Sequence, residues 1–364
     1  MSPSRSGAAR RHLLGALGLL LCLCLGIGSG CAGDGRTPLT VYSPHGRDLL
    51  VLFESEFERA QPAIDMRWLD MGSQEVYDRV RSERANPQAD VWFGGPDAIL
   101  ARAAADDLLA PYRPGWAESI PESSRGAGDL FFGTFRTIPV LVWNSKLVSE
   151  PEAPRDWDDL LAPRFRGKLL VRDPMASGVM RTVFGWKLAT SLAATGSTAG
   201  GFAWLAQLDV QTKEYVANPA LMFEKLSRGE GFVTTWELTD ILLHRQAGDP
   251  IGYAFPRSGT PVIDDAAALV AGAPHRSAAV AFLEWIGSAE AQRLAAERVF
   301  RIPARTDLAP ETLPEWTRAA LAELLPAVYD EALAAREGSA WMADWDARVR
   351  GRGAELVAET APRP

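Results

Sequence analysis

The chain has 364 residues, of which 47% are hydrophobic and 23% charged, with a net charge of −8 and a pI near 5.2. This length and composition are those of a globular protein with room for two lobes. The acidic balance, with no basic block after the N-terminus, argues against nucleic acid as a partner.

Residues 1–30 have the features of an export signal. Basic residues at 5, 10 and 11 precede the apolar run "LLGALGLLLCLCLGIGSG", and small residues precede Cys31. The pattern is similar to a bacterial lipobox, although Gly28 departs from it, and we expect cleavage and lipid attachment at Cys31. The alternative is a retained membrane anchor, because residues 13–30 are just long enough to span. Both interpretations place the body in the cell envelope, in the periplasm or on the outer cell surface.

Cleavage would change the charge and the cysteine content. The signal contains three arginines and no acid, so the net charge of −8 becomes −11, and Cys22 and Cys24 are lost. The mature chain then keeps one cysteine, which excludes internal disulfides and cysteine-rich metal sites. Residues 31–37 are predicted to be a tether.

The first part of the mature chain alternates short apolar strands with amphipathic helices. Strands are predicted at 39–43, 64–70 and 89–95, and helices at 48–60, 73–85 and 97–109. In the first helix Leu49, Leu50, Phe53 and Phe57 share one face. This βαβαβ order predicts a parallel sheet with right-handed crossovers.

The second part predicts a chain that leaves for another lobe and returns. Residues 131–145 are apolar without a helical period and contain Pro139, and 251–259 form a second extended stretch. Between them we expect strands at 168–173, 214–218 and 230–235 and a helix from Gly178. An amphipathic helix is predicted at 277–297. The fold class is therefore α/β, with residues 38–135 and 136–252 in two lobes and residues 253–364 returning to the first and adding C-terminal helices.

The loop after the first strand holds the first candidate ligand residues: Ser43, His45, Gly46 and Arg47. A helix starts here, and the free N–H groups of a helix N-terminus attract anions. Ser43 can donate a hydroxyl, Gly46 permits close approach, and His45 and Arg47 can add positive charge. The alternative is a capped turn with Arg47 in solvent.

The next two loops give weaker signals. Ser73 precedes a helical pattern and is a ligand candidate, although a plain helix cap is the favoured interpretation. Gly95 would let the backbone approach a ligand, but a tight turn would need it too.

The loop "RDPMASGVMRT" is the most informative one. Ser177 and Gly178 open a helix that carries Arg181 and Thr182 in its first turn, which favours an oxyanion site. The alternative is that Ser177 is only an N-cap and that Arg181 pairs with a surface acid.

Three further candidates follow late strands. Trp236 could stack on an organic ligand, although a core role is common for such a residue. Glu237 suits a ligand hydroxyl or amine, with a solvated surface acid as the alternative, and Tyr253 lies in the second crossing.

Four segments together resemble the extracellular solute-binding proteins (family 1) of bacterial ABC importers, in the branch that contains ferric-iron binders and binders of phosphorylated or phosphonate compounds. They are "LTVYSPHG", "ADVWFGGPDAILARAAADDLLAPY", "PRDWDDLLAPRFRGKLLVRDPMASGVMRTVFG" and "FPRSGTPVIDDAAALVAGAPHRSAAVAFLEWIGSAEAQ". The resemblance covers roughly residues 38–306. It implies the type II periplasmic-binding-protein fold, in which two crossing strands form a hinge between two lobes. It also implies capture of a small solute by lobe closure and delivery to a permease with its ATPase.

One departure from the family decides between ligands. Ferric-iron members carry an adjacent tyrosine pair where this chain has Trp236 and Glu237, and hard ferric iron favours phenolate and carboxylate oxygen. We therefore expect a small organic anion, a phosphate ester or phosphonate, with ferric iron as the alternative. In that alternative His45, Glu237 and Tyr253 are the candidate metal ligands.

No catalytic motif accompanies these loops. The sequence lacks a G-x-S-x-G elbow, an H-E-x-x-H helix and a P-loop. His45 is the only histidine in a promising loop, and one histidine without a partnered nucleophile does not make a triad. Binding without chemistry and without a cofactor is expected. Two further classes stay open: a secreted enzyme on the same fold, and a membrane-tethered chemosensory or adhesion module.

Overall fold

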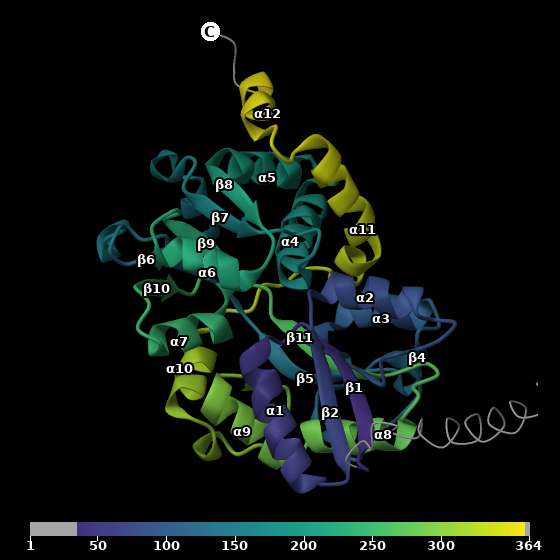
Figure 1. The fold of residues 1–364 in the computed structure, drawn as a ribbon. Coiled ribbons are helices and arrows are strands. Elements are labelled where there is room, and N and C mark those ends of the chain that lie inside the picture. The colour runs from purple at the N-terminus through teal and green to yellow at the C-terminus, as the bar shows by residue number, and fades with distance from the viewer. Residues whose placement is uncertain (1–34, 361–364) are drawn as a thin grey trace, which may run out of the picture.

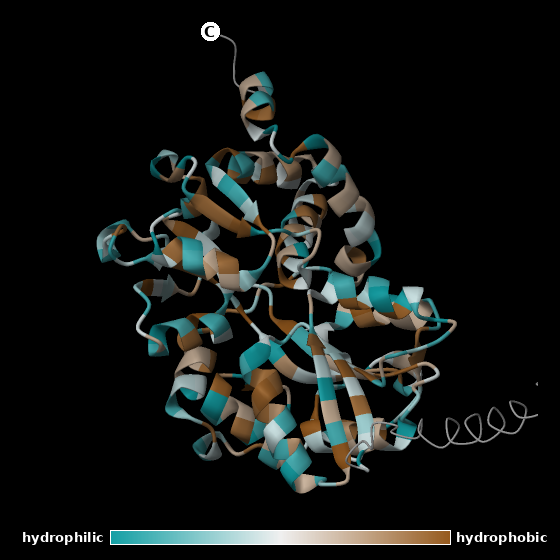
Figure 2. Ribbon diagram, viewed as in Figure 1, coloured by the Kyte–Doolittle hydropathy of each residue, from teal (hydrophilic) through white to brown (hydrophobic). Residues whose placement is uncertain are grey.

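The computed structural model describes residues 35–360, which form two lobes, each built on one sheet with helices against it (Figure 1). The predicted signal and Cys31 lie outside the described residues. Within 35–360, none of the helices combines the length and hydropathy that a membrane span requires. In Figure 2 the strands that lie inside each lobe are mostly hydrophobic and the outer faces of the helices are hydrophilic.

The first lobe contains a mixed sheet with the strand order β12-β5-β11-β3-β1-β2, and β4 pairs with the end of β11. Its strands are β1 (Thr37–Ser43), β2 (Ile64–Asp70), β3 (Val91–Pro96), β4 (Leu109–Ala110), β5 (Phe132–Thr137), β11 (Ile263–Val270) and β12 (Ile302–Pro303). The predicted parallel pairing of β1 with β2 and β3 is confirmed. The strand β11 was not predicted, and it runs antiparallel between β3 and β5. Its alanines have low strand propensity, so the sequence pattern did not indicate a strand here.

Helices cover both faces of this sheet. They are α1 (Arg47–Ala60), α2 (Ser73–Ser82), α3 (Asp97–Ala105), α8 (Arg276–Ile286) and α9 (Ala289–Val299). One hydrophobic cluster joins α1, α8 and α9 to the sheet, and a second joins α2 and α3 to its other face. The predicted apolar face of α1 is buried, as expected from its helical period.

The amphipathic helix predicted at 277–297 is wrong in one respect, because the structure breaks it into α8 and α9. Gly287 ends α8, and the Ser288 hydroxyl accepts a hydrogen bond from the N–H of Ala291 at 3.1 Å to start α9. A Cβ on Gly287 would overlap the indole ring of Trp116, so only glycine fits at the break. The hydrophobic residues keep their helical period across the break, so the sequence pattern alone predicts one continuous helix.

The second lobe contains a five-stranded sheet with the order β10-β6-β9-β7-β8. Its strands are β6 (Pro139–Asn144), β7 (Leu169–Arg172), β8 (Thr212–Val216), β9 (Val233–Glu237) and β10 (Ile251–Ala254), and its helices are α4 (Gly178–Thr195), α5 (Ala199–Gln211), α6 (Pro219–Ser227) and α7 (Leu238–Gln246). Short 3-10 turns complete the chain: η1 (Ala117–Ser119), η2 (Glu122–Ser124), η3 (Ala127–Asp129), η4 (Glu150–Glu152), η5 (Trp157–Leu161), η6 (Pro163–Phe165) and η7 (Pro310–Thr312).

The chain passes between the two sheets three times. It crosses at Ile138 between β5 and β6 and returns between β10 and β11, in the two stretches where extended crossings were expected. A third passage follows β12 and includes α10 (Glu315–Glu323). It leads to α11 (Glu331–Arg348), which packs on α4, and α12 (Gly353–Thr360), which packs on α5. The C-terminal helices therefore belong to the second lobe, whereas the predicted lobe boundaries after residues 135 and 252 stay predictions.

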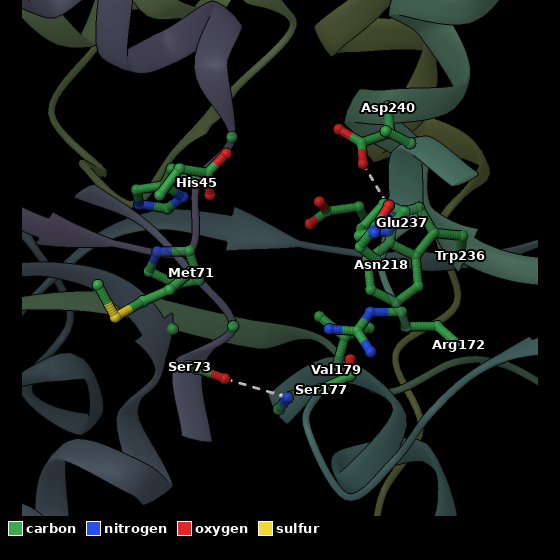
Figure 3. Close-up of a pocket in the computed structure, with 18 of the residues that line it drawn as sticks. His45, Met71, Ser73, Arg172, Ser177, Val179, Asn218, Trp236, Glu237 and Asp240 are labelled. Carbon is green, nitrogen blue, oxygen red and sulfur yellow. Dashed lines mark hydrogen bonds between the residues drawn. The ribbon is translucent and has the colours of Figure 1, made fainter. Parts of the chain in front are cut away.

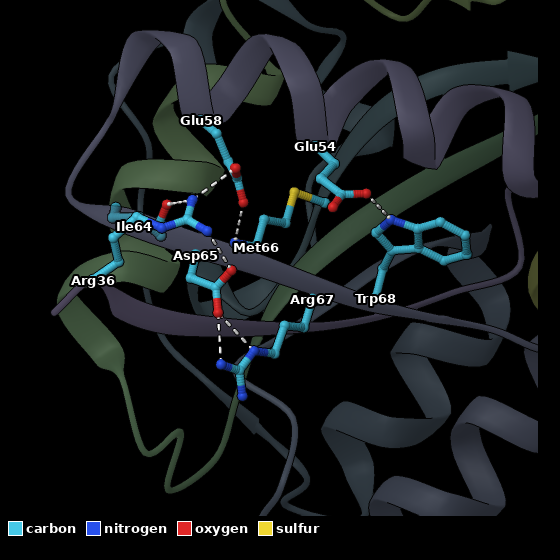
Figure 4. Close-up of polar contacts among 8 residues, drawn as sticks. All are labelled: Arg36, Glu54, Glu58, Ile64, Asp65, Met66, Arg67 and Trp68. Atoms are coloured by element: carbon cyan, nitrogen blue, oxygen red, sulfur yellow. Dashed lines mark hydrogen bonds and ion pairs between the residues drawn. The ribbon is translucent and has the colours of Figure 1, made fainter. Parts of the chain in front are cut away.

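A polar network fixes α1 against the edge of the first sheet (Figure 4). The Arg36 guanidinium pairs with Glu58 at 2.7 Å and with Asp65 at 2.9 Å, and the Trp68 indole N–H donates to Glu54 at 2.7 Å. Such partly exposed pairs add little stability. Their effect is positional, because they tie the body of α1 to β2 while its N-terminus points to the other lobe.

Candidate functional site

A cavity of about 650 Å³ lies between the lobes. Its walls come from the loops after β1, β2 and β3 on one side and after β7, β8 and β9 on the other. The parallel strands of both sheets thus direct their carboxyl ends at this cleft, where open α/β sheets bind ligands.

Four helix N-termini also face the cleft. The first residues of α1, α2, α4 and α6 line it: Arg47, Ser73, Gly178 and Pro219. The first N–H groups of a helix have no partner within the helix, and the helix dipole makes this end positive. The backbone therefore supplies positive potential from both lobes to the same cavity.

Arg172, the last residue of β7, supplies a buried cation on the second-lobe wall. It is 4% exposed, and Figure 3 shows its guanidinium pointing into the cleft. Nη1 donates to the Val216 carbonyl at 3.3 Å, while Nε is buried without a partner, and no carboxylate of residues 35–360 forms an ion pair with it. A Cβ on Gly72 of the first lobe would lie 3.4 Å from Nη2, so the guanidinium reaches the opposite wall. Burial lowers the pKa of Arg172, while the carboxylates of Asp173 and Glu75 act in the opposite direction.

Two candidate serines meet Gly178 at the start of α4. Ser177 caps that helix, as the alternative interpretation predicted, by accepting from the N–H of Met180 at 3.2 Å. The Ser73 hydroxyl accepts from the N–H of Gly178 at 3.0 Å and so joins the lobes directly (Figure 3). The favoured prediction that Ser73 caps α2 is wrong. Gly72 holds the cap position, and its N–H donates to Glu75 at 2.7 Å.

His45 reaches the cleft wall but packs into the first lobe. Its ring lies edge-on to Phe93 and Phe135, with centroids 4.6 Å and 5.7 Å apart, and its Nε2 is buried without a partner. Burial, followed by the nearby Arg301 guanidinium, holds the pKa of His45 well below its usual value. The imidazole is therefore neutral near pH 7 and does not supply the positive charge expected of it.

The rest of the first loop shapes the cleft mouth. Ser43 is fully buried and accepts from the N–H of His45 at 3.1 Å, so its hydroxyl holds the turn. Gly46 has φ 79° and holds the N-cap position of α1, and Arg47 is exposed at the cleft and makes no hydrogen bond or ion pair with a described residue. Gly95 has φ 92°, and a Cβ there would lie 2.9 Å from Cβ of Ser73. Both glycines are thus required by backbone geometry.

Three predicted site residues lie elsewhere. Arg181 and Thr182 line a second cavity of about 660 Å³, between α3, α4 and α11, and Arg181 donates to the Met175 carbonyl at 3.3 Å. Tyr253 is half-buried on β10 beneath the Arg245 guanidinium and lines neither cavity.

Acidic residues occupy another part of the cleft. Glu237 ends β9, Asp240 lies in the first turn of α7, and Asp70 ends β2 on the opposite lobe. Trp236 is 4% exposed, and its indole N–H donates to Asp240 at 2.7 Å, so its polar edge orients that carboxylate (Figure 3). Burial and the neighbouring Asp240 raise the pKa of Glu237 well above its usual value.

Arg301 is a buried cation close to one of these acids, Glu237. It is 3% exposed and donates to the His45 carbonyl at 2.5 Å, while its Nη1 lies 3.9 Å from Glu237. It therefore links the first loop of one lobe to a carboxylate of the other. Within residues 35–360, no three His, Cys, Asp or Glu side chains lie close enough to hold a metal ion.

Several polar residues that line the cleft were not predicted from the sequence, among them Arg172, Asp70, Asp240 and Asn218. Two signals could have found some of them. Arg172 is a charge at the end of an otherwise apolar strand, and Asn218 precedes Pro219, a pair typical of a helix start. Asn218 caps α6 by accepting from the N–H of Leu221 at 2.9 Å.

Two α/β lobes joined by extended crossings, with a polar cavity at their facing strand ends, define a two-lobed ligand-binding protein. The model of the bacterial extracellular solute-binding protein family matches residues 55–323. The chain belongs to that family.

Relatives in sequence agree with this assignment. The chain is 29% identical over 268 residues to a probable ABC transporter periplasmic-binding protein of Sinorhizobium fredii, covering 73% of this chain and 74% of the relative. It is 28% identical over 289 residues to a putative 2-aminoethylphosphonate-binding periplasmic protein of Salmonella typhimurium, covering 78% of each.

Solved structures show the same fold. The periplasmic binding protein AfuA from Actinobacillus pleuropneumoniae, with fructose-6-phosphate bound, matches with a TM-score of 0.75 at 22% identity, over 87% of this chain and 99% of AfuA. Iron-bound HitA from Pseudomonas aeruginosa matches with a TM-score of 0.69 at 20% identity, over 85% and 99%. The fold is therefore the two-lobed periplasmic-binding-protein fold. The protein is the substrate-binding, non-enzymatic component of an ABC importer and acts outside the cytoplasm.

Proposed function

We propose that this protein captures a small organic anion, a phosphate ester or a phosphonate, and delivers it to the permease and ATPase of its importer. The observation that carries the proposal is Arg172, a buried guanidinium that points into the cleft without a carboxylate partner. A buried charge is costly unless it is paired. A bound anion would supply the missing partner.

Phosphate and phosphonate fit this environment better than a carboxylate does. Their several oxygens can accept from the guanidinium fork while the positive N-terminal ends of the helices that line the cleft stabilise the negative charge. The names of two similar proteins, one for 2-aminoethylphosphonate and one bound to fructose-6-phosphate, support the same chemical class.

Binding is coupled to closure of the lobes. The hydrogen bond between Ser73 and Gly178 joins the two walls of the cleft, so it stabilises a shut arrangement. A ligand that contacts both walls shifts the population toward that arrangement. The permease then recognises the shut form.

The test uses ligand-stripped protein without residues 1–30 and a panel of 2-aminoethylphosphonate, glycerol phosphate, fructose 6-phosphate, inorganic phosphate and ferric citrate. Ligand at a hundred times its dissociation constant stabilises the fold by about 2.7 kcal/mol, which raises the unfolding midpoint visibly. Arg172→Gln should abolish the shift. Arg181→Gln is the matched control, because Arg181 is in the same lobe but lines the other cavity. A shift that survives Arg172→Gln would contradict the proposal.

Ferric iron is the competing ligand. Iron-bound HitA shares the fold, and Glu237 and His45 line the cleft, but Tyr253 does not. A shift with ferric citrate alone, with a visible charge-transfer band, would replace the organic anion by iron.

Lipid attachment at Cys31 is a separate part of the proposal, based on the small residues that precede this cysteine. Membrane fractionation of the full chain and of Cys31→Ala tests it. The variant should move to the soluble fraction if the signal is cleaved before residue 31.

A further inference from the structure

The side chains that line the cleft include more acids than cations, which opposes the capture of an anion. The acids are Asp48, Asp70, Glu75, Glu237, Asp240 and Asp265. The arginines of the lining are Arg47 and Arg172, and the imidazole of His45 is neutral near pH 7. A further positive charge close to these acids would favour an anion.

Arg301 is such a charge, although it is not one of the described side chains that line the cleft. It follows α9 in the first lobe and is 3% exposed. Its Nη1 lies 3.9 Å from Oε2 of Glu237 on the second lobe, and no other carboxylate of residues 35–360 forms an ion pair with it. The positive charge of Arg301 is therefore not cancelled by a close partner.

The charge of Arg301 acts on acids of three different strands. Asp70 ends β2, Asp265 lies in β11, and Glu237 ends β9. Burial raises the pKa of each of these carboxyl groups, and the positive charge of Arg301 lowers each of them. The pKa of Asp265 is raised to about 6, so this carboxylate is ionised at pH 8. Arg301 thus offsets negative charge that faces the cleft from both lobes.

The same guanidinium holds the loop at the mouth of the cleft. Its Nη2 donates to the His45 carbonyl at 2.5 Å, and the N–H of His45 donates to the Ser43 hydroxyl at 3.1 Å. The next residue, Gly46, holds the N-cap position of α1, whose first residue lines the cleft. The donors of a guanidinium form a planar fork, so one side chain can fix this carbonyl and act on carboxylates at the same time.

We propose that Arg301 is a positioning residue for anion capture, which offsets the cleft acids from behind the wall and fixes the loop 43–47 through the His45 carbonyl. This inference rests on the proposed function, because it assumes that the ligand is an anion. It adds a residue that sets the affinity of the site without touching the ligand.

Calorimetry at pH 8 tests the charge, with glycerol phosphate, fructose 6-phosphate and 2-aminoethylphosphonate as probes. Arg301→Gln removes the positive charge, so the affinity for these anions should fall at least about tenfold. Arg301→Lys keeps the charge and should stay closer to the wild type. Arg305→Gln is the matched control, because it removes a cation of the same lobe that pairs with Asp307 at 2.6 Å and does not line the cleft.

A second variant separates the charge of Arg301 from its packing. Asp265→Asn removes a negative charge and keeps an acceptor for the Thr137 hydroxyl. Alone it should tighten anion binding. Combined with Arg301→Gln it should restore most of the lost affinity, which a purely structural role of Arg301 would not produce. If Arg301→Gln does not unfold cooperatively in urea, Arg301→Lys and the single variant Asp265→Asn decide.

Each failure has its own signature. An unchanged affinity in Arg301→Gln, or a loss that Asp265→Asn does not reverse, overturns the inference and leaves the anion site at Arg172 standing. An equal loss in Arg305→Gln also overturns it, since the net charge of the lobe would then explain the effect. If the wild type binds none of the three probes, the proposed function fails and this inference fails with it.

Discussion

The Ser73 hydroxyl and the Gly178 N–H are bonded at 3.0 Å across the cleft, although 105 residues separate them in the chain. The contact is close on all sides, because a Cβ on Gly178 would lie 2.6 Å from both Ser73 Oγ and Cδ of Pro96. The first helical residue of α4 is therefore a point of close contact between the lobes. Its lack of a side chain is what lets the lobes meet.

Gly178→Ala tests the role of this contact. The added methyl group would overpack the interface, at a cost of roughly 1–3 kcal/mol, which weakens ligand binding by about 5- to 150-fold. Calorimetry measures the affinity, and small-angle scattering should show that the variant stays extended at ligand concentrations that compact the wild-type protein. Gly185→Ala is the control on the same helix, since its Cβ would meet Ala334 at 3.8 Å, an ordinary contact. Equal affinities of the two variants would contradict the prediction.

Asp97 predicts a pH dependence of stability at the second cavity. Burial, followed by the Asp264 charge, raises the pKa of this first residue of α3 to about 7. The folded protein then binds a proton that the unfolded chain releases near pH 4. The stability that Asp97 contributes is therefore complete below pH 4 and is lost as the pH rises through 7.

The measurement is urea unfolding of wild type and Asp97→Asn between pH 5 and pH 8. Asparagine can still accept from the N–H of Ala98, as Asp97 does at 2.7 Å. The variant should lose less free energy of unfolding than the wild type over this range, since each unit of pKa shift corresponds to about 1.4 kcal/mol. Parallel curves would show that Asp97 ionises normally.

Lys187, in the second lobe, predicts a pH dependence of stability with the opposite sign. Its ammonium lies 4.5 Å from the ring centres of Trp186 and Trp204 and 5.7 Å from that of Trp157. Burial lowers its pKa to about 8, below the usual 10.5. The unfolded chain therefore binds more protons between these values, and the contribution of Lys187 to stability rises with pH across that window. In Lys187→Met this part of the rise should disappear when unfolding is measured from pH 7.5 to 10.5. An unchanged slope would contradict the assignment.

Gly287→Ala tests the break between α8 and α9. Because the new Cβ would overlap the Trp116 ring, either the indole or the helix must move, and we expect a loss of at least about 1–3 kcal/mol in unfolding free energy. Gly338→Ala in α11 is the control. Its Cβ meets nothing within 4 Å, and alanine favours the helix by up to about 1 kcal/mol. If both variants unfold alike, the close packing of Trp116 on Gly287 does not fix the break.

Local patterns predicted the parts of the fold that depend on local order. The apolar period of α1 was predicted correctly, and the cap of α4 by Ser177 was the alternative interpretation of its loop; each depends on neighbours in sequence. The strand β11 was missed, since its alanines become strand only between β3 and β5, which are distant in sequence. The break at Gly287 depends on Trp116, which no pattern within α8 and α9 reveals.

The site was predicted at the level of loops more than of side chains. The loops at 43–47 and 173–178 do meet at the cleft. Which side chains line the cleft depends on tertiary packing. His45 packs against aromatic rings of the first lobe, and Arg181 lines the other cavity. Arg172 lines the cleft because β7 ends at this residue, and its side chain points beyond the end of the strand into the cavity.

The placement of α12 has a practical consequence. β1 runs toward the cleft, so Thr37 lies at the far pole of the first lobe, whereas α12 lies on the outer side of the second (Figure 1). The sequence from 35 to 360 contains no cysteine. One engineered thiol near each pole would therefore accept a donor and an acceptor dye at sites remote from the ligand. Energy transfer between the dyes would then report occupancy in real time, and the protein could serve as an optical sensor for its own solute.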